Sequence, residues 1–431
     1  MKSKIFYIAI LTVFLVSAVC FLPQNVFATQ NNFCITFEYG DKTYVYDQSQ
    51  ISFDKYNLSS VSGLQKRGFF EDNKTKYKIA KEVMSLGFDE IIATKYILVG
   101  IDKLFAQIKN DVYIQKQDSQ IVFDTSLQHP FVISEGVDGV VVDEKALCKN
   151  IIDKLKKSNS FAVSVPVTKV KAVSKQDNIQ KTQLKAVFAT NYQNSSQNRK
   201  DNIALAFGRF DGMVVEPGQQ VSFNQVVGKR TEQNGFKSAK VISFGKYVDG
   251  IGGGVCQAST TLYNALLRAG LQVDEWHRHT LKSSYVQPSF DAMVNDNGAD
   301  LVFTNNTAER VFLKTKCDGT KATVWIYGLQ NEFDFKTESV VEQITKAKEQ
   351  IVADEKGEYQ DKVLFEDESF CLQNPVDGVK SKGYLIATKN GKIVWKKLIR
   401  TDNYATVDKI VVKGVKKRAD SHQKSDNITT L

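Results

Sequence analysis

The stretch GGGVCQASTTLYNALLRAG, residues 252–270, joins a run of glycines to a single cysteine and a long apolar periodicity. Leucines recur about one turn apart after Cys256 and the pattern stops at Gly270, which predicts a helix that begins at the cysteine. The three glycines permit unusual backbone angles, so another strand or a substrate can approach closely. A thiol at a helix N-terminus has a lowered pKa and favours the thiolate. We therefore predict that Cys256 is a nucleophile.

A thiolate nucleophile needs a base, and the chain has only 4 histidines. Two of them, His277 and His279, follow the predicted helix; we prefer His279, because His277 adjoins Trp276 and can serve in packing. Asp291 follows and can orient an imidazole through its second nitrogen. A helix of roughly 14 residues carries the chain ~20 Å from its start, so we expect a return strand within 276–294. The alternative is that Cys256 is a buried core cysteine and the histidines are surface residues.

Other residues are candidates for contacts with a substrate. Backbone N–H groups at the helix start, those of Gly254 and Gln257 among them, can bind an oxyanion. Arg230 can bind a carboxylate in bidentate fashion, although a surface arginine fits the sequence equally well. His277 is a further candidate for substrate binding. The cysteines show no CxxC spacing, so the sequence indicates neither a zinc site nor a redox motif. We expect no metal and no cofactor.

The N-terminal segment has the layout of a secretory signal. Lys2 and Lys4 precede an apolar run, and Val26-Phe27-Ala28 offers a small residue for cleavage. We predict that residues 1–28 are a signal peptide or, if uncleaved, a membrane anchor. The net charge of +9 is spread along the chain. For an exported protein this favours anionic wall polymers over nucleic acid as a partner, or a solvated surface with no partner.

The length of 431 residues suggests two or three domains. Residues 31–170 alternate strand-like and helix-like segments; among them, 93–108 has helical spacing and 161–173 has the alternation of a strand. Part of the polar stretch 172–198 reads as a linker. Residues 199–210 predict a helix whose apolar side chains face inward. Residues 330–418 contain strand-like runs with an Asn390-Gly391 hairpin signal, and the tail 419–431 is polar and predicted to be disordered.

These patterns predict a multidomain α+β protein. The N-terminal domain is α+β, the central domain is mixed α/β with its nucleophile at a helix N-terminus, and the C-terminal module is mainly β.

Residues 190–328 resemble the VanW domain family. The resemblance is carried by PGQQVSFNQVVGKRTEQNGFKSAKVISFGKYVDGIGGGVCQASTTLYNALLRAGL, HRHTLKSSYVQPSFDAMV and ADLVFTNNTAERVFLKT. Residues 31–170 resemble more weakly the peptidoglycan-binding domain that often precedes VanW, and 330–418 resemble a degenerate G5 module. The chain departs from the family pattern beside the proposed base, where Trp276 and Arg278 stand in place of arginine and proline.

The VanW resemblance implies an exported enzyme of the cell wall. It implies L,D-transpeptidation of peptidoglycan stem peptides into 3→3 cross-links, with Cys256 as nucleophile and His279 as the histidine of the family motif. Two alternatives stay open. One is a cysteine L,D-carboxypeptidase or peptidase acting on wall peptides, and the other is a non-enzymatic protein that binds peptidoglycan or a glycopeptide.

Overall fold

The computed structural model describes residues 33–50, 72–243 and 246–418. They form two compact units, one built from residues 33–50, 72–120 and 134–175, the other from 121–133, 176–243 and 246–418. Helices and strands occur in both units, which confirms the predicted α+β class. The predicted signal segment 1–28 and tail 419–431 lie outside the described residues. Within the described ranges, no helix is long and apolar enough to cross a membrane.

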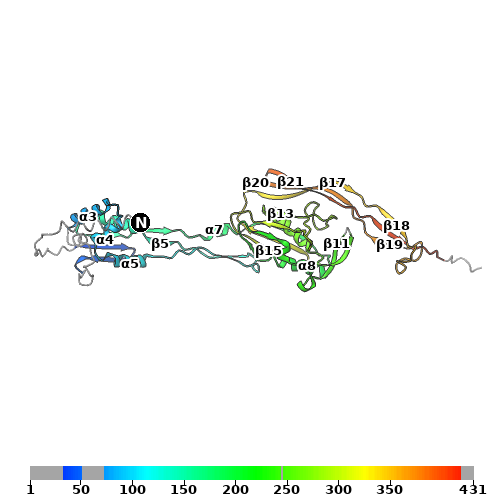
Figure 1. Cartoon of the computed structure of the whole chain (residues 1–431), viewed down its shortest axis with the longest axis horizontal. Coiled ribbons are helices and arrows are strands. Elements are labelled where there is room, and N and C mark those ends of the chain that lie inside the picture. Colours follow the sequence, from blue (N-terminus) through cyan, green and yellow to red (C-terminus); the bar gives the residue numbers. More distant parts are fainter. Residues whose placement is uncertain (1–32, 51–71, 244–245, 419–431) are drawn as a thin grey trace, which may run out of the picture. The chain divides into compact units, whose positions relative to one another are not determined.

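The first unit packs helices against a three-stranded sheet of order β2-β1-β6, in which β1 and β6 run parallel (Figure 1). Its core is apolar and includes Phe37 and Phe105, whose rings meet edge to face at 5.9 Å. Its elements are β1 (Cys34–Tyr39), β2 (Lys42–Asp47), a short 3-10 helix (Gln48–Gln50), α3 (Asn73–Ser85), α4 (Glu90–Ile97), α5 (Ile101–Val112), β5 (Gly139–Val142), α6 (Glu144–Lys154), β6 (Ser160–Ser164) and β7 (Val167–Val170).

Two predicted elements of this unit are divided in the structure. The helical pattern of 93–108 is broken between α4 and α5, because Gly100 adopts a positive φ of 80° that ends one helix and begins the next. The alternating stretch 161–173 becomes β6 and β7, and Pro166, which cannot donate to a strand ladder, stands between them. Periodicity alone does not register such breaks.

The central part of the second unit packs α8 and α10 against an antiparallel sheet of order β8-β16-β15-β9. Its core lies between these helices and this sheet. Its elements are β3 (Ile121–Phe123), β4 (Phe131–Ile133), α7 (Lys175–Gln180), β8 (Gln183–Asn191), α8 (Gln197–Gly208), β9 (Met213–Val215), β10 (Gln220–Ser222), α9 (Phe223–Val227), a short 3-10 helix (Glu232–Asn234), β11 (Ser238–Ser243), β12 (Lys246–Ile251), α10 (Val255–Ala269), β13 (Gln272–Glu275), β14 (Val302–Thr304), β15 (Val311–Cys317) and β16 (Lys321–Gly328).

The stretch 172–198, part of which was predicted to be a linker, contains regular structure over much of its length. It contains α7 and β8, and β8 is an edge strand of the sheet that supports α10. By contrast, the helix predicted from 199–210 is α8, and Ile203, Phe207 and Phe210 are buried as expected. The residues of β8 alternate between exposed and more buried positions, as expected of a strand in an antiparallel sheet that has one face in water.

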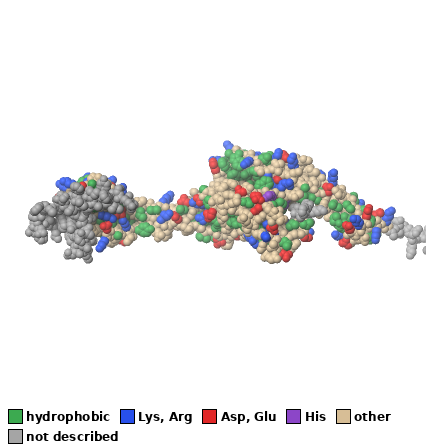
Figure 2. Space-filling view, viewed as in Figure 1, with side chains coloured by type: hydrophobic (Ala, Val, Ile, Leu, Met, Phe, Trp, Pro, Cys, Tyr) green, Lys and Arg blue, Asp and Glu red, His purple; other side chains and the backbone are tan. Residues whose placement is uncertain are grey.

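The C-terminal module has two sheets, of order β17-β20-β21 and β18-β22-β19 (Figure 1). Its strands are β17 (Asp334–Thr345), β18 (Glu349–Ala353), β19 (Ser369–Gln373), β20 (Gly378–Lys389), β21 (Lys392–Tyr404) and β22 (Lys409–Lys413). Asn390 and Gly391 both have positive φ and join β20 to β21, as the hairpin signal predicted. On the face shown in Figure 2, lysine and arginine side chains are interspersed with acidic ones and do not form a single basic patch.

Candidate active site

Cys256 is the second residue of α10, as the glycine pattern predicted. Gly254 caps the helix with a φ of 112°, a conformation that other residues rarely adopt. Gly253, the middle glycine, is required for a different reason, the close approach of another strand. A Cβ on Gly253 would stand 2.8 Å from the backbone carbonyls of Ala239 and Lys240 on β11. The glycines therefore let β11 pass directly over the start of the helix that carries the thiol.

The Cys256 thiol lies in a half-buried position, and its protonated form donates to the carbonyl oxygen of Val294 at 3.2 Å. Burial by itself would raise the pKa of Cys256. The hydrogen bond and the charge of His279 outweigh burial and, with a smaller contribution from the charge of Arg230, lower it. Deprotonation of Cys256 is thereby made easier beside the imidazole of His279.

His279 is held in place by Asp291. Its ring nitrogen Nδ1 lies 2.7 Å from Asp291 Oδ2, and its backbone N–H donates to the same oxygen at 2.7 Å. Only 6% of His279 and 1% of Asp291 are exposed. With Nδ1 turned to the carboxylate, the other ring nitrogen is left for the thiol, which is the geometry of a Cys–His–Asp triad.

The pKa values of this pair move in opposite directions. Burial alone would lower the pKa of His279, but Tyr285, Asp291 and Cys256 raise it well above its usual value. Burial alone would raise the pKa of Asp291, but the hydrogen bond and charge of His279, together with Arg400 and Tyr404, lower it to about 2. Both groups are therefore charged at neutral pH, as a buried ion pair.

His277 lies elsewhere. Its Nε2 is 2.7 Å from Glu275 Oε1, and its side chain is 42% exposed. The backbone carbonyl of His277 accepts from the N–H of Met293 at 2.7 Å, which joins the two ends of the loop that contains His279 and Asp291. The return toward Cys256 therefore needs no strand over 276–294, since β13 and this extended loop accomplish it.

Two of the residues predicted to contact a substrate, Arg230 and Gln257, form hydrogen bonds within the protein. The guanidinium of Arg230 is paired with Asp296 Oδ1 at 2.6 Å and with Asn224 Oδ1 at 2.5 Å. The N–H of Gln257 donates to the carbonyl of Gly254 at 2.9 Å and is not an oxyanion donor here. The prediction for the N–H of Gln257 needs this correction, because sequence does not show which polar groups the fold itself uses, and substrate binding by Arg230 stays a prediction.

The N–H groups of Gly254 and Cys256 are the remaining candidates for binding an oxyanion. Among the described residues, no acceptor is found for the N–H groups of these two positions, which lie at the start of α10. The side chain of Gln257 has a supporting part: it is buried, accepts from Arg199 at 3.0 Å and donates to the carbonyl of Asn191 at 2.9 Å. It thereby fixes the helix start to the end of β8.

Several residues of the site were not predicted. Ser283 Oγ lies 3.5 Å from His279 Nδ1, and the phenol of Tyr285 is close enough to interact electrostatically with both His279 and Cys256. Both belong to the 276–294 segment, in which the sequence predicted only His277, His279 and Asp291 as site residues. Arg400 and Tyr404 bind Asp291 from β21, more than a hundred residues along the chain, and no local pattern points to them.

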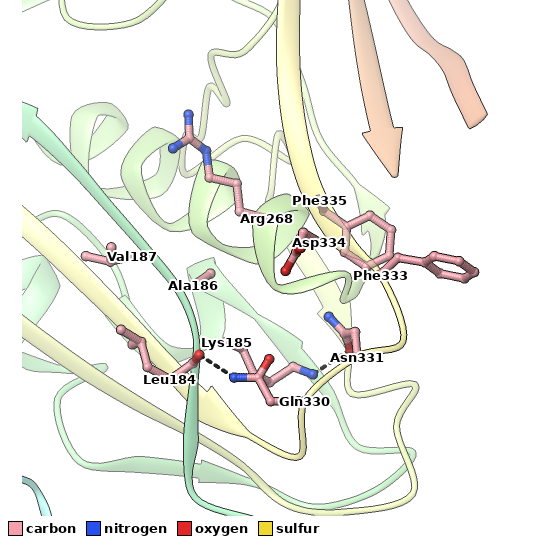
Figure 3. A pocket seen from close by; sticks show the side chains of 10 residues that line it. All are labelled: Leu184, Lys185, Ala186, Val187, Arg268, Gln330, Asn331, Phe333, Asp334 and Phe335. Carbon is pink, nitrogen blue, oxygen red and sulfur yellow. Dashed lines mark hydrogen bonds between the residues drawn. The ribbon is translucent and has the colours of Figure 1, made fainter. Parts of the chain in front are cut away.

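A separate pocket of about 280 Å³ lies at the opposite end of α10 (Figure 3). Arg268 and Lys185 line it, and the Lys185 ammonium donates to the Leu329 carbonyl and to Asn331 Oδ1, both at 2.5 Å. Burial lowers the pKa of Lys185 to about 8. Since α10 carries the chain ~18 Å between Cys256 and Arg268, this pocket is distinct from the cysteine site. Its polar groups bind the segment that leads into β17.

The chain is similar to known proteins over two of its parts. The chain matches the family described as VanW like protein over residues 198–327 and the G5 domain over 342–416. It is 40% identical to the uncharacterized protein YoaR of Bacillus subtilis over 146 residues, which are 34% of this chain and 48% of that one. It is 26% identical to the vancomycin B-type resistance protein VanW of Enterococcus faecalis over 117 residues, 26% of this chain and 42% of that one.

The chain thus spans about half the length of the curated relatives it matches. The crystal structure of HP0197-G5 is 25% identical, and the match covers 20% of this chain and 100% of that one with a TM-score of 0.12. The resemblance of 31–170 to a peptidoglycan-binding domain stays a prediction. The two family matches confirm the other resemblances, and the chain contains a VanW-like domain followed by a G5 domain.

Proposed function

We propose that this protein is a cysteine L,D-transpeptidase that forms 3→3 cross-links in cell-wall peptidoglycan. The observation that supports it is the Cys256 thiol at the start of α10, paired with a His279 that Asp291 holds by two hydrogen bonds. A thiolate beside an imidazolium is the resting state of a cysteine acyl-transfer enzyme. The VanW-like domain that carries the three residues directs the proposal to the cell wall.

In the first half of the reaction, the Cys256 thiolate attacks the carbonyl of the third stem-peptide residue. The negative charge on the tetrahedral oxygen is bound by the N–H groups of Cys256 and Gly254. His279 then gives its proton to the amine of the terminal D-residue, which leaves as the carbon–nitrogen bond breaks. An acyl-enzyme and a neutral His279 remain.

In the second half, the amine of a neighbouring stem attacks the thioester. His279 accepts the proton of that amine, the carbon–sulfur bond breaks and the thiolate is restored. Asp291 keeps its charge throughout, so its part is to orient His279 and to stabilise the imidazolium. If water takes the place of the amine, the same residues release a shortened stem, which is L,D-carboxypeptidase activity.

The test uses the full chain with purified muropeptides and mass analysis of the products. We expect 3→3 dimers and one released D-residue per cross-link, and we expect Cys256→Ala to abolish both. Cys371→Ala is the matched control, because Cys371 is an exposed free cysteine in the C-terminal module. Full activity in Cys256→Ala overturns the proposal, and shortened monomers without dimers assign the hydrolytic alternative.

The G5 domain favours a second candidate, a non-enzymatic protein that binds the wall. In that case the chain binds isolated sacculi through residues 342–416 and Cys256→Ala leaves binding intact, with no thiol-dependent product. Either function requires export, with peptidoglycan stem peptides or anionic wall polymers as partners. Fractionation of the producing cells tests location, and we expect the protein in the cell wall or on the extracellular face of the cell.

A further inference from the structure

Asp291 is shared between two parts of the chain. Its oxygen Oδ2 serves His279, while Oδ1 accepts from Tyr404 Oη at 2.6 Å and from Arg400 Nη2 at 3.1 Å. Arg400 Nη1 also donates to the backbone carbonyl of Asp291 at 2.6 Å. Arg400 and Tyr404 both lie on β21. The carboxylate that orients the histidine is thus itself oriented by the C-terminal module.

Arg400 is a fixed group. Its side chain is fully buried, its Nε donates to Asp402 Oδ2 at 2.6 Å, and its guanidinium lies 4.1 Å from the ring centre of Trp276. A buried guanidinium loses its hydration, and only paired carboxylates and satisfied donors offset that loss. Its fork-shaped donors bridge Asp402 and Asp291 at once, which a lysine ammonium cannot reproduce.

Further contacts hold the loop of His279 and Asp291 against β20 and β21. The N–H of Ala405 donates to the Thr280 carbonyl at 2.8 Å. Ser289 donates through its N–H to Tyr404 Oη, and its hydroxyl lies 2.8 Å from that of Ser381 on β20. Gly383 of β20 leaves room for the loop, since a Cβ there would stand 3.0 Å from the Ser289 carbonyl.

We propose that Arg400 and Tyr404 are positioning residues for His279, acting through Asp291, and that the C-terminal module is an integral part of the active site. For the cross-linking reaction the inference rests on the proposed function. For the state of the Cys256 thiol it does not, since the geometry of His279 determines that state whatever the substrate.

The charged and titratable groups around the triad come from every element packed against it. They are Cys256 and Tyr263 of α10, His279, Tyr285 and Asp291 of the loop, Arg230 before β11, and Arg400, Asp402 and Tyr404 of β21. Removing the Arg400 charge would change the electrostatic balance as well as the geometry. Variants that leave every charge in place therefore isolate positioning.

The experiment uses Tyr404→Phe and Arg400→Lys in the full chain. Each is measured for Cys256 alkylation by iodoacetamide across pH, resolved peptide by peptide, and for kcat and KM of cross-linking. Matched controls are Tyr384→Phe, whose ring packs near Lys396 on the same sheet, and Arg418→Lys, which is exposed and paired with Asp367.

If Asp291 no longer holds His279 in place, the thiolate loses its partner and the pKa of Cys256 rises. We expect the alkylation midpoint of both variants to move up by about one pH unit, so that alkylation below the midpoint is about tenfold slower. We expect kcat to fall by about tenfold with KM nearly unchanged, and both controls to match the wild type.

An unchanged thiol profile and kcat in folded Tyr404→Phe overturn the inference, and this variant decides it if Arg400→Lys does not fold. The two proposals fail separately. Cross-linking that survives Cys256→Ala disproves the reaction, while a shifted thiol midpoint in Tyr404→Phe still supports positioning. Cross-linking that requires Cys256 but tolerates both β21 variants supports the reaction and disproves positioning.

Discussion

The pKa of the Cys256 thiol is lower than its ordinary value, and the pKa of the His279 ring is higher than its ordinary value. The lowered pKa of Cys256 keeps the thiolate until the pH falls through it, and the raised pKa of His279 keeps the imidazolium until the pH rises through it. We therefore predict a bell-shaped rate of cross-linking, with its plateau between these two values. Rates measured on muropeptides from pH 4 to pH 10 test this, and a rate that only rises toward the ~8.5 of free cysteine contradicts it.

The other cysteines provide internal references for thiol chemistry. Burial raises the pKa of Cys148 to about 12 and that of Cys317 to about 11. Alkylation at neutral pH should therefore label Cys256 well before these two, and unfolding should remove the difference. Equal labelling of all three in the native protein would show that Cys256 is not activated.

Asp291 contributes to stability as well as to orientation. Replacing it with alanine leaves Arg400 buried with Asp402 as its remaining carboxylate partner, and we predict a loss of about 3–5 kcal/mol in unfolding free energy. Asp367→Ala, which removes an exposed partner of Arg418, should cost at most about 1 kcal/mol. Urea denaturation of both variants measures this, and similar losses would contradict it.

The Asp291 carboxylate also makes the folding stability depend on pH in the acid range. Because its folded pKa of about 2 lies below the ~3.9 of an unfolded aspartate, its contribution to stability is complete above ~4 and is lost as the pH falls toward 2.

The sequence predicted Asp291 because it stands in one stretch with His279. Arg400 and Tyr404 escaped prediction because the contact that gives them meaning forms only when distant parts of the chain fold together.

At the scale of elements, the start of α10 depends on a glycine with ordinary backbone angles. A Cβ on Gly253 would meet the backbone of β11 at 2.8 Å, whereas one on Gly208, at the end of α8, meets nothing within 4 Å. We predict that Gly253→Ala costs about 1–3 kcal/mol and slows Cys256 alkylation, while Gly208→Ala changes neither. Thermal unfolding with thiol labelling tests the pair, and equal behaviour would contradict the steric account.

The elements that sequence predicted well are those whose signal is local. The helix from Cys256 to Gly270 and the Asn390-Gly391 hairpin each contain their own start and stop residues. The strand β8 was not predicted within the polar stretch 172–198, because its support comes from β16, far along the chain. The loop that carries His279 has no regular structure at all, and side chains from β20 and β21 hold its shape.

At the scale of the whole second unit, we predict that the loop of His279 and the strand β21 open together, because both bind Asp291. Asp291→Ala should raise amide hydrogen exchange in β21 as well as in the loop of His279, because both lose the same partner. Hydrogen-exchange mass spectrometry of the full chain measures this, with Asp367→Ala as reference. Exchange that rises only within the loop would show that the C-terminal module is stabilised independently.

Arg400, Asp402 and Tyr404 alternate along β21, so all three side chains belong to one face of the strand. A C-terminal module transplanted from another protein would leave Asp291 and His279 without these partners, unless it brought the same Arg-x-Asp-x-Tyr spacing in the same register. That short pattern, RTDNY in this chain, is what a protein engineer would have to preserve when exchanging modules.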